Sequence, residues 1–158
     1  MAKTALVTGA SSGIGREIAR DLSARGFRVI LSARREERLR ELAEELGDNT
    51  RVIVCDVSDR EECLRLYEET KSEKISVLVN CAGFGAVGSF DKLPLDTELK
   101  MIDTNVTAVH MLTKLFLKDF VAADRGYIMN IASSAGLMYG GPMTVSYTHL
   151  RAHETRGN

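Results

Sequence analysis

The sequence is short of cysteine and of net charge, and these shortages exclude several classes of protein. Its three cysteines, Cys55, Cys63 and Cys81, are scattered and form no C-x-x-C pair, so we expect neither a disulfide framework nor a zinc site. The 21 basic and 22 acidic residues leave a net charge of −1, whereas nucleic-acid and acidic-membrane partners usually require a basic excess. The composition therefore predicts no nucleic-acid partner and no membrane partner, and it leaves small neutral or anionic ligands open.

A leader segment and long apolar runs are also missing. Met1 leads directly into AKTALVTGA, without the basic region, apolar region and small-residue cleavage site of a secretory signal. No apolar run approaches the roughly 18 residues that span a bilayer. We therefore expect a cytoplasmic protein. With 158 residues, of which 44% are hydrophobic, the chain is large enough to form one globular domain with its own core.

Strand-like apolar runs alternate with helical patterns along most of the chain. Strands are expected at 3–8, 27–32, 50–56, 77–83 and 126–133, and helices at 14–26, 35–47, 59–71 and 96–122. Strands that are apolar on both faces, with helices of ten or more residues between them, are typical of a parallel sheet that is covered on both sides. The predicted fold class is therefore α/β, a doubly wound parallel sheet of the Rossmann type in three αβα layers.

Three helix ends carry recognisable signals. Gly47 follows the second helix in the manner of a left-handed C-cap. Ser58 and Glu61 have the S-x-x-E spacing of a capping box for the third helix. Asp96 is the expected N-cap of the long fourth helix.

A glycine-rich turn, TGASSGIG (8–15), lies between the first strand and the first helix. Its glycines allow a tight turn and a close approach of a ligand, and the free N–H groups of the helix, with the helix dipole, favour a pyrophosphate. A merely structural turn is the alternative, but the position after the first strand of a βαβ unit favours the ligand. The residues expected to bind a dinucleotide here are Gly9, Ser11, Ser12, Gly13, Ile14 and Gly15.

The end of the second strand indicates which dinucleotide is bound. An acidic residue would be expected there for the adenosine ribose hydroxyls, but the sequence reads Ser32-Ala33-Arg34-Arg35. The planar fork of Arg34 suits a 2′-phosphate, so the predicted cofactor is NADP, with NAD as the alternative. We interpret Arg35, like the arginines that follow it, as part of the solvated, salt-bridged face of a glutamate-rich helix.

With these motifs in order, the chain resembles the short-chain dehydrogenase/reductase family, in its classical branch. The resemblance rests on TGASSGIG (8–15), Asp56-Val57, NCAG (80–83), Asn105 within MIDTNVTA, and NIASSAG (130–136). It implies the strand order 3-2-1-4-5. It also implies that Asp56 binds the adenine amino group with Val57 beside the ring. The residues that would line the adenosine and ribose side of the cofactor are Asn80, Ala82 and Gly83.

The resemblance also implies a catalytic set. Ser133, rather than Ser134, would hold the substrate carbonyl oxygen, and Asn105 would hold a water in a proton relay or, alternatively, bend a buried helix. The family uses a tyrosine as general acid/base with a lysine four residues later, whose charge favours the phenolate. Tyr147 lies fourteen residues after Ser133, at about the expected position, but Arg151 replaces the lysine, and this exchange is not conservative.

The end of the chain has a second resemblance. VSYTHLRAHET (145–155) reads like a translated sequencing adapter, so we expect residues 145–158 to be a non-native tail and residues 1–144 to be an incomplete, C-terminally truncated NAD(P)-binding Rossmann domain. The position of Tyr147 would then be a coincidence. The alternatives are a divergent catalytic helix and a metal pair from His149 and His153, but two histidines without a third ligand seldom hold a metal, and no metal is predicted.

Two functions remain open at this point. The first is an NADP-dependent oxidoreductase that transfers hydride between the nicotinamide and a carbonyl or secondary alcohol, including a 3-oxoacyl thioester. The parent protein would form a homodimer or homotetramer, and the truncated chain would be inactive. The second is a non-catalytic NAD(P)-binding regulatory protein of the same fold. Ser133 favours the first.

Overall fold

The computed structural model describes residues 3–133. The sheet contains five parallel strands in the order β3-β2-β1-β4-β5. In chain order the strands are β1 (Thr4–Thr8), β2 (Arg28–Ala33), β3 (Thr50–Val54), β4 (Ile75–Asn80) and β5 (Tyr127–Asn130). The order reverses between β1 and β4, so the predicted doubly wound sheet and its strand order are confirmed.

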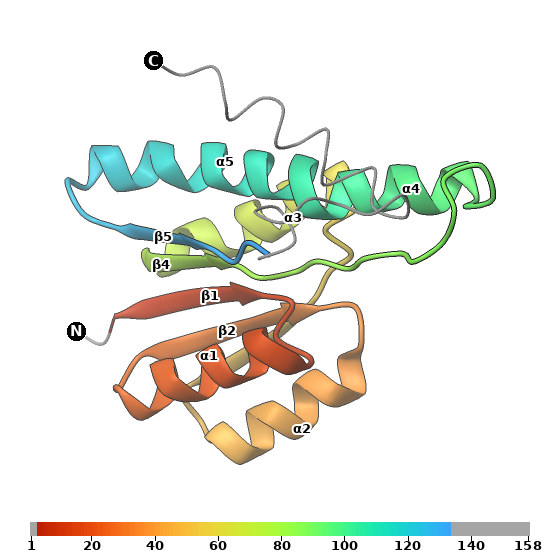
Figure 1. Cartoon of the computed structure of the whole chain (residues 1–158). Coiled ribbons are helices and arrows are strands. Elements are labelled where there is room, and N and C mark those ends of the chain that lie inside the picture. The colour runs from red at the N-terminus through yellow and green to blue at the C-terminus, as the bar shows by residue number, and fades with distance from the viewer. Residues whose placement is uncertain (1–2, 134–158) are drawn as a thin grey trace.

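Helices cover both faces of this sheet. They are α1 (Gly13–Ala24), α2 (Glu36–Leu46), α3 (Arg60–Thr70), α4 (Leu95–Ile102) and α5 (Ala108–Ala122), with a short 3-10 turn η1 (Lys71–Glu73) before β4. Figure 1 shows α1 and α2 on one side of the sheet and α3, α4 and α5 on the other. The expected three-layer arrangement is therefore present. Among the described residues, every helix is too short or too polar to cross a bilayer.

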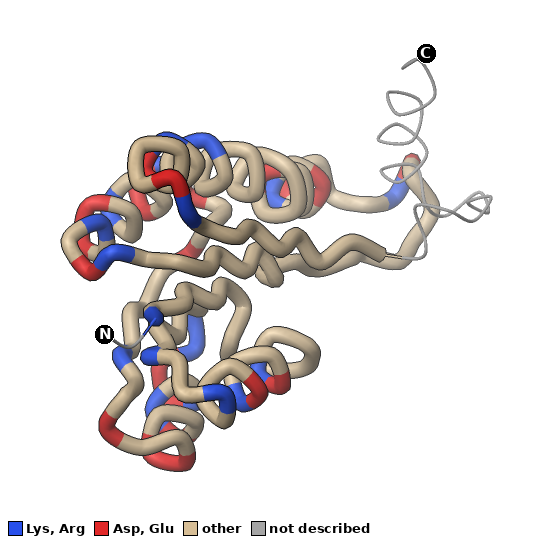
Figure 2. The backbone as a smooth tube through the Cα atoms, turned by 90° about the vertical axis from the view of Figure 1, so that its left-hand side faces the viewer, with Lys and Arg blue, Asp and Glu red and all other residues tan. Residues whose placement is uncertain are grey.

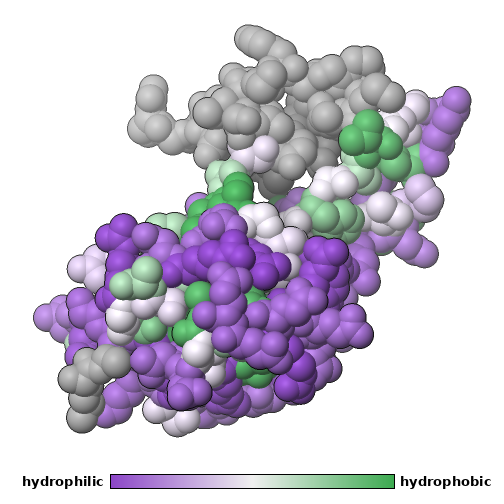
Figure 3. All heavy atoms as spheres, turned by 90° about the horizontal axis from the view of Figure 1, so that it is seen from below, coloured by the Kyte–Doolittle hydropathy of each residue, from purple (hydrophilic) through white to green (hydrophobic). Residues whose placement is uncertain are grey.

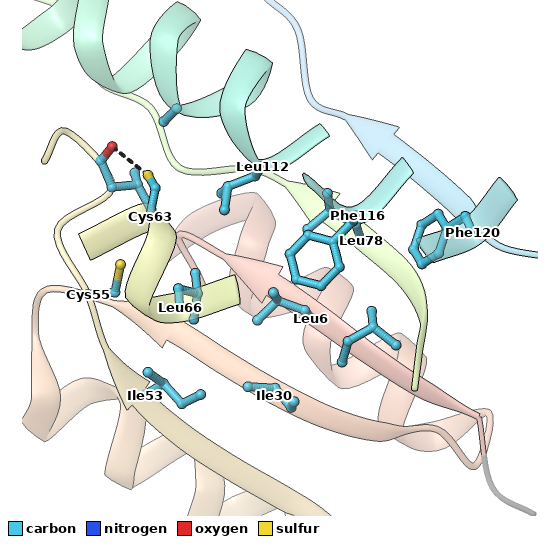
Figure 4. Close-up of a cluster of buried hydrophobic side chains, with 13 residues drawn as sticks. Leu6, Ile30, Ile53, Cys55, Cys63, Leu66, Leu78, Leu112, Phe116 and Phe120 are labelled. Carbon is cyan, nitrogen blue, oxygen red and sulfur yellow. Dashed lines mark hydrogen bonds between the residues drawn. The ribbon is translucent and has the colours of Figure 1, made fainter. Parts of the chain in front are cut away.

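The larger hydrophobic cluster lies between the sheet and the α3/α5 layer. Leu6, Leu78 and Phe116 are fully or almost fully buried within it (Figure 4), and Phe116 meets Tyr67 edge to face with ring centroids 5.2 Å apart. Each large apolar side chain buried in this way contributes about 1.5–3 kcal/mol. Cys63 belongs to the same cluster, and its thiol donates to the Val57 carbonyl oxygen at 3.2 Å.

The second cluster lies under α1 and α2, and it includes Val7, Leu31 and Leu42. The outer surface of this layer is dominated by hydrophilic side chains, as the view from below shows (Figure 3). Charged residues gather on the helices and at the ends of strands, whereas the strand interiors are almost free of them (Figure 2). This division explains why strands that are apolar on both faces appear in the sequence as continuous hydrophobic runs.

The three cysteines are free thiols that differ in burial. Cys55 and Cys63 are buried free thiols, and Cys81 is partly buried. Burial raises the pKa of Cys55 to about 12 and that of Cys63 to about 11. Protonated thiols are poor nucleophiles, so these two residues act as small apolar side chains.

Local helix ends differ from the expectations in three places. Gly47 has a φ of +82° but a ψ of −165°, which is outside the left-handed helical region, although its N–H still reaches the Ala43 carbonyl oxygen. Asp59 rather than Ser58 caps α3, because its carboxylate accepts the Glu61 N–H at 2.9 Å. The Ser58 hydroxyl instead donates to Asp56. The predicted capping box was therefore wrong.

The long fourth helix is also interrupted. It begins at Leu95 with Pro94 as the N-cap, so the Asp96 cap was wrong as well. Between α4 and α5 lies a π-helical segment, η2 (Asp103–Thr107), which includes Asn105. Segments of this kind are rare and are frequently found at functional sites.

Strand β5 forms one edge of the described sheet. Its side chains are much more exposed than those of β1, and Tyr127 and Met129 retain 73% and 49% of their surface. This exposure leaves an apolar edge on the described part of the sheet. Unprotected edges of this kind favour association with other strands.

Candidate functional site

The carboxyl ends of the parallel strands meet at one edge of the sheet, and most of the predicted site residues follow these ends directly. In open α/β sheets, ligands bind at this edge, where the strand order reverses. Here the reversal lies between β1 and β4. The turn after β1, Asp56 after β3 and Gly83 after β4 therefore belong to one region of the fold.

Two glycines of the first turn lie where no side chain fits. Gly9 has a φ of +70°, and a Cβ on it would lie 2.7 Å from the main-chain N and Cα of Ala82. A Cβ on Gly15 would lie 2.5 Å from the Gly9 carbonyl oxygen. The turn after β1 thus packs backbone against backbone, both on the first turn of α1 and on the loop after β4.

Thr8 fastens these two loops together. Its hydroxyl accepts the N–H groups of Cys81 and Ala82 at 3.1 and 3.2 Å, and it donates to the Val79 carbonyl oxygen at 3.2 Å. The residue is buried, so the hydrogen bonds are shielded from water. The glycine-rich turn is therefore held at a fixed position relative to the NCAG loop.

The N-terminus of α1 differs from those of α2 and α3. Helices α2 and α3 carry two glutamates each in their first turns, whereas α1 carries no acidic residue there. Its N-cap residue, Ser12, makes no side-chain capping hydrogen bond. The first N–H groups of a helix and the positive end of its dipole attract an anion. This helix end therefore retains the partial positive charge that the other two neutralise with their own side chains.

Arg35 corrects one of the expectations. It does not simply belong to a solvated helix face, because its guanidinium donates to the hydroxyls of Ser11 and Ser12 at 3.0 and 2.7 Å. The arginine thereby brings a cation to the glycine-rich turn. Further along α2, Arg40 pairs with Glu36 at hydrogen-bond distance, as the expectation for the other arginines required.

Asp56 lies just after β3 and contacts residues from three segments of the chain. Its Oδ1 accepts the N–H and the hydroxyl of Ser58 at 3.1 and 2.8 Å. Its Oδ2 lies 3.4 Å from the Lys100 ammonium and 3.9 Å from the Arg34 guanidinium. Burial alone would raise the pKa of Asp56, but the Ser58 hydrogen bonds and Lys100 outweigh it and hold the pKa below its usual 3.8. Asp56 is therefore an ionised acceptor.

Four of the remaining predicted positions lie around this region. Val57 is buried next to Asp56, whereas Ile14 projects from α1 with 61% of its surface exposed. Asn80 is buried, and its amide donates to Thr113 and Asn130 at 3.1 and 2.9 Å. The Asn80 side chain thus joins β4 to α5 and β5, and it supports the edge from within. Ala82 is partly buried in the loop that Thr8 holds.

Asn105 clamps the loop that follows Gly83. From the π-helical segment, its amide donates to the Phe84 carbonyl oxygen at 2.9 Å and accepts the Phe84 N–H at 3.1 Å. A Cβ on Gly83 would approach the Asn105 Oδ1 to 3.1 Å. The loop and the interrupted helix are therefore fitted to each other.

The catalytic positions are covered only in part. Ser133 is exposed three residues beyond the end of β5, on the same edge of the sheet as the glycine-rich turn. Tyr147, Arg151, His149 and His153 lie outside the described residues. Within residues 3–133, no group of three or more histidine, cysteine, aspartate or glutamate side chains is arranged to hold a metal ion.

Sequence reasoning missed three contributors to the site: Thr8, Arg35 and Lys100. Thr8 stands inside the quoted motif and could have been singled out as a buried hydroxyl at the end of a strand. Arg35 and Lys100 act through contacts with residues 23 and 44 positions away in the chain, at Ser12 and Asp56. No spacing rule predicts such contacts without the three-dimensional fold.

Comparison with known proteins agrees with this geometry. The sequence model of the family described as short chain dehydrogenase matches residues 3–149. An uncharacterized oxidoreductase of Staphylococcus saprophyticus is 37% identical over 140 residues, which cover 85% of this chain and 60% of the relative. The 3-oxoacyl-(acyl-carrier-protein) reductase of Rickettsia prowazekii is 36% identical over 150 residues, covering 95% and 61%. The chain thus spans about 60% of the length of these curated relatives.

Solved structures give the same result. Serine dehydrogenase from Escherichia coli matches with a TM-score of 0.84 and 34% identity, covering 96% of this chain and 71% of that one. A metagenomic short-chain oxidoreductase in complex with NADP matches with a TM-score of 0.88 and 32% identity, covering 96% and 72%. The motifs, the strand order and both comparisons agree, and the chain belongs to the short-chain dehydrogenase family.

Proposed function

We propose that this chain holds the cofactor site of an NADP-dependent oxidoreductase, which transfers hydride between the nicotinamide and a carbonyl or secondary alcohol. A 3-oxoacyl thioester is the substrate class we favour. The name of the Rickettsia relative, a 3-oxoacyl-(acyl-carrier-protein) reductase, supports this class, and the NADP complex of the metagenomic oxidoreductase supports the cofactor.

The observation that carries the proposal is the bare N-terminus of α1. It has no acidic residue in its first turn and no side-chain cap, and Arg35 adds a cation at Ser11 and Ser12. A diphosphate fits these features, since it would bring the negative charge that α2 and α3 already possess. A Cβ on Gly13 would meet nothing within 4 Å, so the turn has open space beside it.

The adenosine half would be held by residues that lie around Asp56. We assign the adenine amino group to Asp56 and the adenine ring to Val57, with Ile14 exposed on the first turn of α1. Ala82 and Gly83 would line the ribose side, and Asn80 would support them from beneath. Arg34 would bind the 2′-phosphate, and we add Arg35 to this assignment because it already lies at the glycine-rich turn.

The residues that the chain contributes to catalysis would act on the substrate oxygen. When bound, NADPH supplies the hydride for the carbonyl carbon. The Ser133 hydroxyl would donate a hydrogen bond to the carbonyl oxygen and stabilise the negative charge that develops there. Asn105 would fix the loop at Phe84 and hold a water in the path of the proton. The tyrosine position of this mechanism corresponds to Tyr147.

For the end of the chain we retain the adapter interpretation as a proposal. Residues 1–144 would then be the native, incomplete Rossmann domain, and residues 145–158 a foreign tail, although the family match continues to residue 149. The 158-residue chain would bind NADP and lack turnover. The parent protein would be a homodimer or homotetramer, and the exposed apolar side chains of α5, Leu117 and Val121, support such an assembly.

Cofactor titration of the 158-residue chain tests the proposal. We expect NADP to bind at least about tenfold more tightly than NAD, because a charged hydrogen bond to the 2′-phosphate contributes roughly 1.5–3 kcal/mol. Arg34→Asp should shift the preference toward NAD, because it removes the cation for the 2′-phosphate and supplies an acidic acceptor for the ribose hydroxyls. Tryptophan is absent from the chain, so calorimetry is the suitable measurement.

Arg38→Gln is the matched control for Arg34→Asp, since it removes another exposed arginine, from α2. It should leave both affinities within twofold of the wild type. No binding of either dinucleotide at millimolar concentration would contradict the proposed function. Equal affinities for the two dinucleotides in the wild type would contradict only the choice of NADP.

A further inference from the structure

The Asp56 carboxylate is held from two sides by different elements. On one side, Ser58 donates its N–H and its hydroxyl to Oδ1. On the other side, Lys100 reaches across from α4 and places its ammonium 3.4 Å from Oδ2. Lys100 and Asp56 are 44 positions apart in the chain. Their contact therefore joins two segments that the sheet topology brings to the same edge.

The two oxygens are therefore not equivalent for a ligand. A carboxylate offers about four lone-pair positions, and the two donors of Ser58 occupy those of Oδ1. Lys100 approaches Oδ2 as an ion pair at 3.4 Å, which leaves Oδ2 as the oxygen that can accept from an amino group. Since Lys100 and Ser58 act on opposite oxygens, together they restrict rotation of the carboxylate about the Cβ–Cγ bond.

Arg34 is the second cation near Oδ2, but it is less well placed. Its guanidinium is 3.9 Å from Oδ2, which is beyond hydrogen-bond distance, and more than half of its side chain is exposed. A 2′-phosphate would draw Arg34 away from Asp56. Lys100 would then be the cation that remains beside Asp56. The adenine ring would shield this carboxylate from water, and an unpaired charge is costly in such surroundings.

We infer that Lys100 is a positioning residue that holds the Asp56 carboxylate as the acceptor for the amino group of adenine, and thereby selects adenine over bases without this donor. The inference rests on the proposed function. The backbone of Lys100 is fixed, because its carbonyl oxygen accepts a hydrogen bond from the hydroxyl of the buried Thr104 at 2.8 Å. Its side chain remains about half exposed, and its ammonium forms an ion pair with Asp56.

Base selectivity is the measurement that separates this role from a general effect of charge. NADP and its hypoxanthine analogue carry the same phosphates, but only NADP carries the amino group at C6. The 158-residue chain is titrated with both ligands by calorimetry. We expect Lys100→Gln to lower the ratio of the two affinities by roughly threefold, as is typical of a partly exposed ion pair.

Two variants serve as controls. Lys100→Arg keeps the cation and should restore the ratio to within twofold of the wild type. Lys114→Gln removes a charge from an exposed position on α5 and should leave the ratio unchanged. Circular dichroism of each variant confirms that the fold is retained.

Each other outcome overturns the inference. If Lys100→Gln weakens both ligands equally, the lysine acts on the phosphates and not through Asp56. If the wild type binds NADP but does not prefer it over the hypoxanthine analogue, Asp56 does not read the base, although the proposed function stands. If the wild type binds neither ligand, the proposed function fails and the role of Lys100 fails with it.

Discussion

The N-termini of α1 and α3 lie at the same edge of the sheet and are built in opposite ways. Helix α3 begins with Asp59, which caps the Glu61 N–H, and it has Glu61 and Glu62 in its first turn. Helix α1 begins at Gly13, with an uncapped Ser12 before it and no acidic residue in its first turn. Each helix follows a parallel strand, so the fold alone does not account for the difference.

Under the proposed function, this difference separates a helix end that is structural from one that binds a ligand. At α3, side chains satisfy the first N–H groups and neutralise the dipole, and the end is stable without any partner. At α1, no side chain caps the first N–H groups or neutralises the dipole. A helix end of this kind is less stable than a capped one. Under the proposed function, the diphosphate of the cofactor would supply the missing interactions.

The largest effect is expected when α1 is given an acidic N-cap like that of α3. Ser12→Asp places a carboxylate at the N-cap, where it would accept the first N–H groups of the helix and repel a diphosphate. NADP affinity should fall by more than about tenfold, and the free energy of unfolding should rise by about 0.5–1 kcal/mol. Calorimetric titration and urea denaturation measure the two effects on the same protein.

Ser12→Ala is the control for the loss of the serine hydroxyl, which accepts from Arg35. It removes that hydrogen bond without adding a negative charge, so NADP affinity should fall much less than in Ser12→Asp. Wild-type affinity in Ser12→Asp would show that the α1 terminus does not bind the diphosphate.

A smaller effect is expected from the reverse change at α3. Asp59→Ala removes the cap that accepts the Glu61 N–H, and it should lower the free energy of unfolding by about 1 kcal/mol. NADP affinity should stay within twofold of the wild type, since Asp59 faces its own helix. Affinity that falls as far as in Ser12→Asp would erase the distinction between the two helix ends.

The smallest effect concerns pH. A hydrogen bond from Arg65 holds the pKa of Glu62 below its usual 4.5. A lowered pKa in the folded state means that the stabilisation is present above the unfolded-state pKa and is lost as the pH falls through the folded-state pKa. The urea midpoints of the wild type and Glu62→Gln should therefore differ most near neutral pH and converge as the pH falls below 4.5. A difference that grows on acidification would contradict this assignment.

The sequence predicted the fold because its signals are local and repeated. Apolar runs such as those around Leu6 and Leu78 identify buried strands without any tertiary information. The glycine-rich turn is equally easy to identify from the sequence, since Gly9 and Gly15 lie where side chains are excluded. These two kinds of signal were enough to predict the doubly wound α/β class, whereas the strand order came from the resemblance to the short-chain dehydrogenase/reductase family.

The features that were missed depend on choices between near-equivalent groups. Ser58 and Asp59 are adjacent potential caps, and the structure uses Asp59 because Ser58 turns toward Asp56. The π-helical segment around Asn105 has no signature in the hydrophobic pattern. Lys100 reaches Asp56 only because α4 follows a loop whose path the sequence does not specify. Side-chain direction and loop path are tertiary properties.

Amide hydrogen exchange with and without saturating NADP tests the central claim most directly, since it reports on both helix ends in one protein. The account predicts slower exchange for the amides of residues 10–15 in the presence of NADP, and unchanged exchange for those of residues 60–63 at the start of α3. Unchanged exchange at residues 10–15, or equal slowing at both helix ends, would contradict it.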